Sequence, residues 1–304
     1  MHILKGYTKQ EISWMMYDWA NSAHSVIIVT LLPIFFDTVA GYTADSVSSM
    51  STWGYATSIA MLIVALAAPF LGVFGDIRGM RKKLFSFFML LGVAACAGMA
   101  FTPGMDFTSG PVAAGKVATL ILVLYIVSVI GFDASAIYYD AFLTDVTIED
   151  RMDKVSTMGY GLGYIGGSTI PLLIFLIMNL VGVPMLTCLA FVFGLTAVWW
   201  LAFSLPLLKN CEQTSGKPYE KGDVARSIKG VGTTIKEIIA NKPMLIYILS
   251  YFFYIDGVHT VISMATTYGT NLGLDSTGMM LALLLVQILG LPFCLLYIKC
   301  SEKF

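Results

Sequence analysis

The side chains that could do chemistry in this sequence lie on two polar stripes inside long apolar stretches, residues 17–36 and 244–268. In each stretch the polar residues recur at positions i, i+3 and i+4, which fall on one face of a helix. An ionisable side chain in a membrane helix indicates a functional site, because burying its charge in lipid is costly. The stripes predict a substrate-binding set that consists of Asp18, Asn21, Ser22, Ser25, Asp256, His259 and Thr260.

The two aspartates suggest that a proton moves with the solute. A carboxylate that faces a cavity could take up and release a proton as the cavity opens to alternate sides. A structural role is the alternative for Asp18, which lies near one end of its helix and could reach the interface or cap a neighbouring helix. Asp133, in another apolar stretch, is a further cavity candidate, whereas His24 is expected to be packed and hydrogen-bonded.

Composition sets the class of protein that carries these stripes. The 304 residues are 57% hydrophobic and only 12% charged, whereas about 25% of a soluble domain is charged. About 20 apolar residues span the hydrocarbon core of a bilayer as a helix. Eight segments qualify, which predicts eight transmembrane helices: 12–36, 52–74, 84–101, 117–142, 155–180, 184–205, 244–268 and 279–298.

Lysine and arginine predict how these helices are oriented. With eight spans, all of the 18 basic residues except Lys116 fall on one side. Because basic loops stay in the cytoplasm, we expect both ends of the chain to be cytoplasmic and the protein to lie in the plasma membrane.

The chain divides at its longest polar loop. We expect a six-helix bundle over residues 1–206, a cytoplasmic linker over 207–243, and the first two helices of a second bundle over 244–304. Residues 23–27 (AHSVI) are similar to 258–262 (VHTVI), so the seventh segment looks like a restart of the first. In the linker, five apolar residues at helical spacing predict a basic amphipathic helix on the cytoplasmic face: Ile228, Val231, Ile235, Ile238 and Ile239.

A glycine-rich and basic motif follows the second segment, Gly72-Val-Phe-Gly-Asp76-Ile-Arg78-Gly79-Met-Arg81-Lys82. It resembles the loop 2–3 signature of the major facilitator superfamily. The resemblance implies a conformational latch in which Asp76 sits at the start of a helix in the other half of a transporter. It also implies that Arg81 pairs with an acid near the end of the fourth segment, either Asp140 or Asp145. The predicted latch comprises Gly72, Asp76, Arg78, Gly79, Arg81, Lys82, Asp140 and Asp145.

The first polar stripe narrows the resemblance. Tyr17-Asp18-Trp19-Ala20-Asn21-Ser22-Ala23 is similar to the first-helix signature of the superfamily branch related to the fungal vacuolar amino-acid effluxers. The resemblance implies an all-α integral membrane protein with a major-facilitator-like helix bundle, made of a six-helix N-terminal half and the first two helices of a C-terminal half. It implies a secondary transporter that moves a small solute, with amino acids as one candidate, by alternating access. Because such transporters have twelve helices, we expect an incomplete copy, truncated after its eighth helix, that does not transport alone.

Two other classes of protein stay open. A non-transporting remnant or scaffold is one alternative. An intramembrane aspartyl protease is the other, because Asp140 follows Tyr139 in a helix, but a second aspartate in a Gly-x-Gly-Asp setting is missing. The sequence has no metal-ligand spacing, phosphate loop or catalytic triad. We therefore expect no enzyme activity, metal, cofactor or nucleic-acid partner.

A face of glycines is the last feature that the sequence predicts. Gly159, Gly163 and Gly167 recur every four residues in the fifth segment. Small residues at this spacing let another helix backbone approach closely.

Overall fold

The computed structural model describes residues 4–43, 49–216, 218 and 223–301. The regular elements in these ranges are all helices. In chain order they are α1 (Lys9–Ala40), α2 (Ser49–Gly75), α3 (Arg81–Met99), η2 (Thr102–Gly104), α4 (Pro111–Val146), η3 (Glu149–Arg151), α5 (Met152–Leu162), η4 (Gly163–Ser168), α6 (Thr169–Leu180), α7 (Met185–Asn210), α8 (Asp223–Ala240), α9 (Lys242–Asn271) and α10 (Ser276–Ser301).

Eight helical stretches of the described chain are long and apolar enough to cross a membrane. Each coincides with one predicted segment, so the predicted all-α membrane fold with eight spans is confirmed. The fifth span is continuous from Glu149 to Leu180, and it contains one π-helical turn, η4. The sixth span, α7, continues through Pro206 to Asn210. The division of the chain at residues 206 and 243 stays a prediction.

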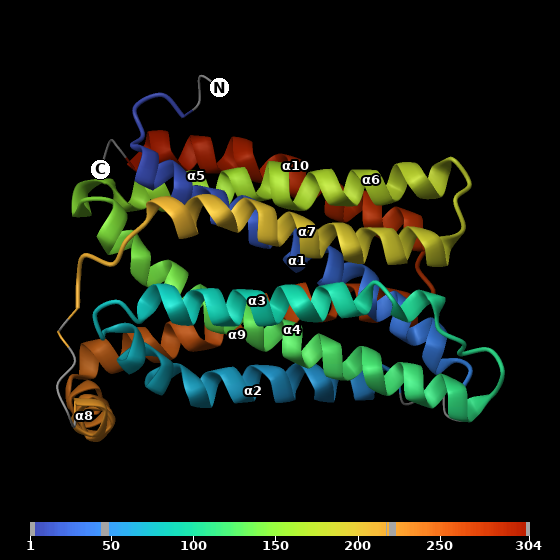
Figure 1. Ribbon diagram of the computed structural model, residues 1–304, viewed down its shortest axis with the longest axis horizontal. Helices are drawn as coiled ribbons and strands as arrows, with labels where there is room; N and C mark the ends of the chain where they lie inside the picture. The colour runs from blue at the N-terminus through green and yellow to red at the C-terminus, as the bar shows by residue number, and fades with distance from the viewer. Residues whose placement is uncertain (1–3, 44–48, 217, 219–222, 302–304) are drawn as a thin grey trace.

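Helix α1 is the centre of the bundle. In its most apolar window 72% of the residues are buried, against 11% for α2. It lies between α5–α7 on one side and α2–α4 on the other (Figure 1) and packs against α4, α5, η4 and α7. Tyr17, Ile27 and Phe35 on α1 are at most 1% exposed. On the polar stripe of α1, Asp18 and Asn21 are buried, whereas Ser22 and Ser25 are half-buried.

Local chemistry determines how α1 begins and how α2 joins α3. The Thr8 hydroxyl accepts a hydrogen bond from the Glu11 amide at 3.1 Å, and Glu11 Oε2 accepts one from the Thr8 amide at 2.7 Å. This capping box satisfies two amides that a helix start leaves unpaired. Between α2 and α3, Gly79 has a φ of +81°, a conformation that favours glycine because it has no Cβ. The chain therefore reverses within a short loop.

The last two spans pack on different parts of the first six. Helix α10 packs against α5 and η4, where a Cβ on Gly290 would lie 2.4 Å from Cγ of Tyr164. Helix α9 packs against α1, α2 and α8, and none of its spanning window is buried. Helix α8 covers the stretch in which the sequence predicts an amphipathic helix.

Candidate functional site

Asp18 is a buried carboxylate at the meeting point of α1, α4 and α5. The residue is 7% exposed, and its Oδ2 accepts a hydrogen bond of 2.7 Å from the Tyr139 hydroxyl of α4. On the α5 side, a Cβ on Gly159 would lie 2.3 Å from the same oxygen, so α5 reaches Asp18 only because residue 159 is glycine. Within the described part of the chain, no basic side chain forms a salt bridge with Asp18.

Aromatic side chains hold Tyr139 in place beside Asp18. The Trp14 ring stacks on the Tyr139 ring with centroids 4.3 Å apart, and Trp14 Nε1 donates to the Tyr139 carbonyl at 2.9 Å. Tyr17 also packs against Tyr139, and its hydroxyl lies 2.8 Å from Ser135 Oγ. The donor to Asp18 is therefore fixed by packing rather than free to rotate.

Ser22 and the backbone of Trp19 on α1 also lie against the predicted glycine face. A Cβ on Gly163 would lie 2.5 Å from Ser22 Oγ, and one on Gly167 would lie 2.4 Å from the Trp19 carbonyl. Asn21 is 8% exposed and Ser25 is half-buried. The prediction that these glycines allow close approach of another helix is confirmed, and that helix is α1.

Substituting Gly167 tests this contact. Gly167→Ala should lower the free energy of unfolding by about 1–3 kcal/mol, the usual cost of overpacking a well-packed core, because the new methyl group meets backbone on α1. Gly115→Ala on α4 is the matched control, since a Cβ there has no neighbour within 4 Å. Thermal unfolding of both variants in one detergent measures the difference. Equal stability of the two variants would show that α1 and η4 are not closely packed.

His24 and Asp133 differ in how far they are buried. His24 is 2% exposed, its Nε2 lies 3.2 Å from Ser128 Oγ, and its ring stacks on Phe132, so it is packed and hydrogen-bonded as expected. Asp133 is half-buried on α4. It remains a candidate for a cavity-facing carboxylate.

The second polar stripe lies apart from Asp18. Asp256, His259 and Thr260 are exposed on α9, although α9 itself contacts α1. The structure therefore brings together the stripe of α1 with α4 and α5, and it leaves the stripe of α9 on an outer surface. Their common role in binding a solute stays a prediction.

The predicted latch contains a buried ion pair between Arg81 and Asp145. Nη1 of Arg81 donates to Asp145 Oδ2 and also to the Ala141 carbonyl at 3.0 Å. The two side chains are 5% and 0% exposed. Asp140, the other acid that the sequence leaves open as a partner of Arg81, is exposed. Asp76 is 85% exposed and lies 3.9 Å from Arg81.

Three residues that follow α7 join this latch, and the sequence did not predict them. Gln213 Oε1 accepts from the Gly79 amide at 2.8 Å, and Gln213 Nε2 donates to the Gly75 carbonyl at 3.0 Å. Asp145 Oδ1 accepts from the amides and the hydroxyls of Thr214 and Ser215 at 2.8–3.1 Å. We call residues 213–215 the strap, because they tie the start of the linker to the α2–α3 loop and to the end of α4. Of the remaining latch residues, Lys82 donates to the Cys211 carbonyl at 3.1 Å, Arg78 is exposed, and Gly72 is half-buried.

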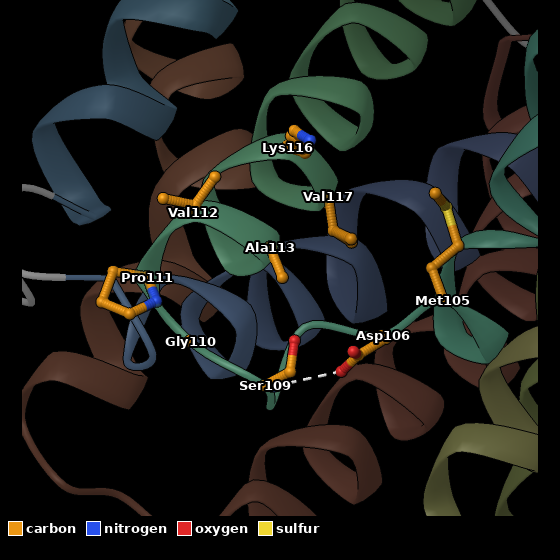
Figure 2. A pocket seen from close by; sticks show the side chains of 9 residues that line it. All are labelled: Met105, Asp106, Ser109, Gly110, Pro111, Val112, Ala113, Lys116 and Val117. Carbon is orange, nitrogen blue, oxygen red and sulfur yellow. Dashed lines mark hydrogen bonds between the residues drawn. The ribbon is translucent and has the colours of Figure 1, made fainter.

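A hollow of about 550 Å³ lies between η2 and the start of α4 (Figure 2). The connection from α3 to α4 is at the end of the bundle opposite α8 (Figure 1). Asp106 at its rim is tied into its own turn, since it accepts from the amides of Thr108 and Ser109 at 3.1 Å. Hydrogen bonds from Ser109 and Thr108 hold the pKa of Asp106 below its usual range. The hollow contains none of the predicted site residues, so we do not assign the solute to it.

Comparison with known proteins gives consistent results. Residues 42–304 match the family described as "Vacuole effluxer Atg22 like". The "Uncharacterized MFS-type transporter YxiO" of Bacillus subtilis is 39% identical over 310 residues, which cover 99% of this chain and 70% of that protein. "Autophagy-related protein 22-1" of Penicillium rubens is 26% identical over 159 residues, which cover 48% of this chain and 27% of that protein.

Among solved structures, the chain is similar to a D-xylose-proton symporter, with a TM-score of 0.61 over 97% of this chain and 69% of that one. The sequence identity is 15%, so this likeness shows the fold alone. It confirms the predicted major-facilitator-like helix bundle.

Proposed function

The chain belongs to the Atg22-like vacuole effluxer family and is a membrane transporter of the major facilitator type, and from this premise we propose that it moves a small solute by alternating access with Asp18 as the carrier of a coupling proton. Amino acids are the solute class that the resemblance to fungal vacuolar effluxers suggests. We further propose that the chain lies in the plasma membrane with its basic end in the cytoplasm.

The burial of Asp18 without a basic partner carries this proposal. An ionised carboxylate in an apolar interior needs a counter-charge or several hydrogen bonds. Within the described chain Asp18 has one donor, the neutral hydroxyl of Tyr139. Protonation of Asp18 therefore favours the packed arrangement seen here, and ionisation favours one in which water reaches the carboxylate.

The neighbours of Asp18 fit a change between these two states. Gly159 and Gly163 allow α5 and η4 to close against α1, so a small separation of these helices would admit water. Asp140, the residue after Tyr139, is exposed. Asp140, which is open to water, thus lies next in sequence to Tyr139, which donates a hydrogen bond to Asp18.

Binding of the solute is assigned to polar side chains on α1 and α9. Asn21, Ser22 and Ser25 line the same face of α1 as Asp18. Asp256, His259 and Thr260 would contribute from α9 when the two stripes face one path. This arrangement follows the general pattern in which solute sites lie near the midplane between two bundles.

Substituting Asp18 tests the proposal. Proteoliposomes that contain a pH-sensitive dye test this proposal against the expectation of an incomplete copy that does not transport alone. A gradient of a mixed set of neutral amino acids that drives proton movement through the unmodified chain supports the proposal, and no movement supports the incomplete copy. Asp18→Asn should reduce this movement by at least about tenfold, because an amide cannot carry the proton. Asp106→Asn should leave it unchanged, since Asp106 is exposed and lies in the loop between η2 and α4.

Folding has to be separated from coupling in this experiment. Asp18→Asn keeps the size of the side chain and its ability to accept from Tyr139, so its thermal unfolding in detergent should match that of the unmodified chain. A folded Asp18→Asn variant that still moves protons with the solute would contradict the role of Asp18.

A further inference from the structure

Helix α8 lies across the end of the bundle rather than along it. In Figure 1 the membrane-spanning helices run lengthwise, whereas α8 is seen end-on beside the start of α9. It packs against α2 and α9, and it ends at Ala240, directly before α9 begins at Lys242. Its axis is therefore close to the plane of a membrane that the other helices cross, at the end of the bundle where the basic residues gather.

The sequence of α8 has two distinct faces. At 100° per residue its large apolar residues fall within an arc of about 100°. They are Val224, Ile228, Val231, Ile235, Ile238 and Ile239. On the same helical wheel of the sequence the basic residues Arg226, Lys229 and Lys236 stand outside this arc, and they exceed the acids Asp223 and Glu237 by one. This pattern is typical of helices that lie in the bilayer interface.

Part of the apolar face has no protein cover in the structure. Ile235 is 51% exposed and Ile239 is 57% exposed, whereas Ile238 is half-buried. Helix α2, on which α8 packs, also presents exposed apolar side chains, Leu62 at 59% and Leu66 at 66%. On a membrane-spanning helix such side chains are expected to face lipid. Because α8 packs on α2, we expect the lipid that surrounds α2 to end close to α8.

We propose that α8 is an interfacial helix that inserts Ile235 and Ile239 at the boundary of acyl chains and headgroups and binds anionic lipid headgroups through its basic residues. The bilayer is the occupant because the eight spans place it at the ends of α2 and α9, where α8 lies. The excess of basic residues complements the negative charge of phosphatidylglycerol or phosphatidylserine headgroups. The proposal depends on neither the solute nor the proton.

Accessibility of spin labels tests the insertion. The full chain first receives Cys294→Ser and Cys300→Ser, because these are the two of its five free thiols that are not buried. In this background a single cysteine for the spin label replaces Ile235, Ile239 or Thr233. Thr233 is exposed and lies on the polar side of α8, so it is the matched control. In nanodiscs of phosphatidylcholine with phosphatidylglycerol, labels at 235 and 239 should collide more with oxygen and less with a nickel chelate than the label at 233.

Two other results would overturn the insertion. Labels at 235 and 239 that meet the nickel chelate as often as the label at 233 would place this face of α8 in water. Labels shielded from both reagents would show that protein, not lipid, covers the face.

Lipid charge is tested separately. The label at 239 should collide more with oxygen, relative to the nickel chelate, when phosphatidylcholine nanodiscs are replaced by nanodiscs that contain phosphatidylglycerol. Lys236→Gln should reduce this shift. Lys83→Gln on α3, which also removes an exposed lysine, should leave the shift unchanged. An identical position of the label in both lipids would overturn the recognition of anionic headgroups.

Discussion

Asp145→Ala should lower the free energy of unfolding by about 3–5 kcal/mol, the range measured when one partner of a buried ion pair is removed. The Arg81 guanidinium would then stay buried with its charge uncompensated, because its side chain is 5% exposed and Asp76 lies 3.9 Å away in solvent. Titration of the purified chain with SDS in mixed micelles measures the loss.

The same substitution should release the last two residues of the strap, Thr214 and Ser215. The amides of Thr214 and Ser215 both donate to Asp145 Oδ1, so both should exchange hydrogen faster in Asp145→Ala. Gln213 should keep its bonds to Gly75 and Gly79, because neither involves Asp145. Hydrogen exchange thus distinguishes a local release of the strap from general unfolding.

Asp150→Ala is the control for this prediction, since Asp150 is an exposed acid in the α4–α5 connection. Its effect should stay within about 0.5 kcal/mol, as is usual for surface substitutions. In the double variant Arg81→Ala/Asp145→Ala, the loss should be smaller than the sum of the two single losses, because no charge is left buried. Additive losses would contradict a direct ion pair.

The membrane spans could be predicted from sequence because length and hydropathy decide them. An apolar stretch of about 20 residues has few alternatives to a spanning helix. Helix ends depend on individual bonds instead: α1 begins at Lys9 because of the cap between Thr8 and Glu11, ahead of the predicted start at residue 12. Hydropathy does not detect such a cap, although the Thr-x-x-Glu spacing does.

The sequence reduced the candidate partners of Arg81 to two acids but could not choose between them. Asp140 and Asp145 are five residues apart, so they point about 140° from each other on a helix. Only the packing of α3 on α4 determines which of them faces Arg81, and it is Asp145. The strap was beyond sequence reasoning, because Gln213 reaches the α2–α3 loop across a separation of 134 residues, and a short polar run gives no sign of its partner.

The Asp18 site could also be predicted only in part. The polar spacing on α1 and the glycine spacing on α5 were each visible in the sequence, and the two faces meet in the structure. The donor to Asp18 was not predicted, because a tyrosine in an apolar helix reads as a packing residue until its hydroxyl is placed. The exposure of Asp256 was not predicted either, since spacing gives a face of a helix and not what that face contacts.

Arg151→Ala should lower the unfolding temperature by roughly 5 °C or more, because it leaves a buried carboxylate without its cation. Glu11 is 1% exposed. Its Oε1 and Oε2 each accept from the Arg151 guanidinium at 2.9 Å, and Thr147 donates to Oε1 at 2.7 Å. The Arg151 side chain is 34% exposed, so water screens part of the attraction. This screening keeps the expected loss below that of the fully buried Arg81–Asp145 pair.

A second substitution shows whether the charge of Glu11 causes this loss. Glu11→Gln in the Arg151→Ala background should recover part of the lost stability, because a neutral amide needs no counter-charge. Its oxygen still accepts from the Thr8 amide, and its NH2 group donates to the Thr147 hydroxyl, which can turn to accept. Lys83→Ala, which removes an exposed basic residue on α3, should leave the unfolding temperature within about 1 °C. If Arg151→Ala and Lys83→Ala unfold at the same temperature, the hydrogen bonds from Thr8 and Thr147 alone are enough to stabilise the buried carboxylate, and the ion pair adds nothing to the packing of α1 against the α4–α5 connection.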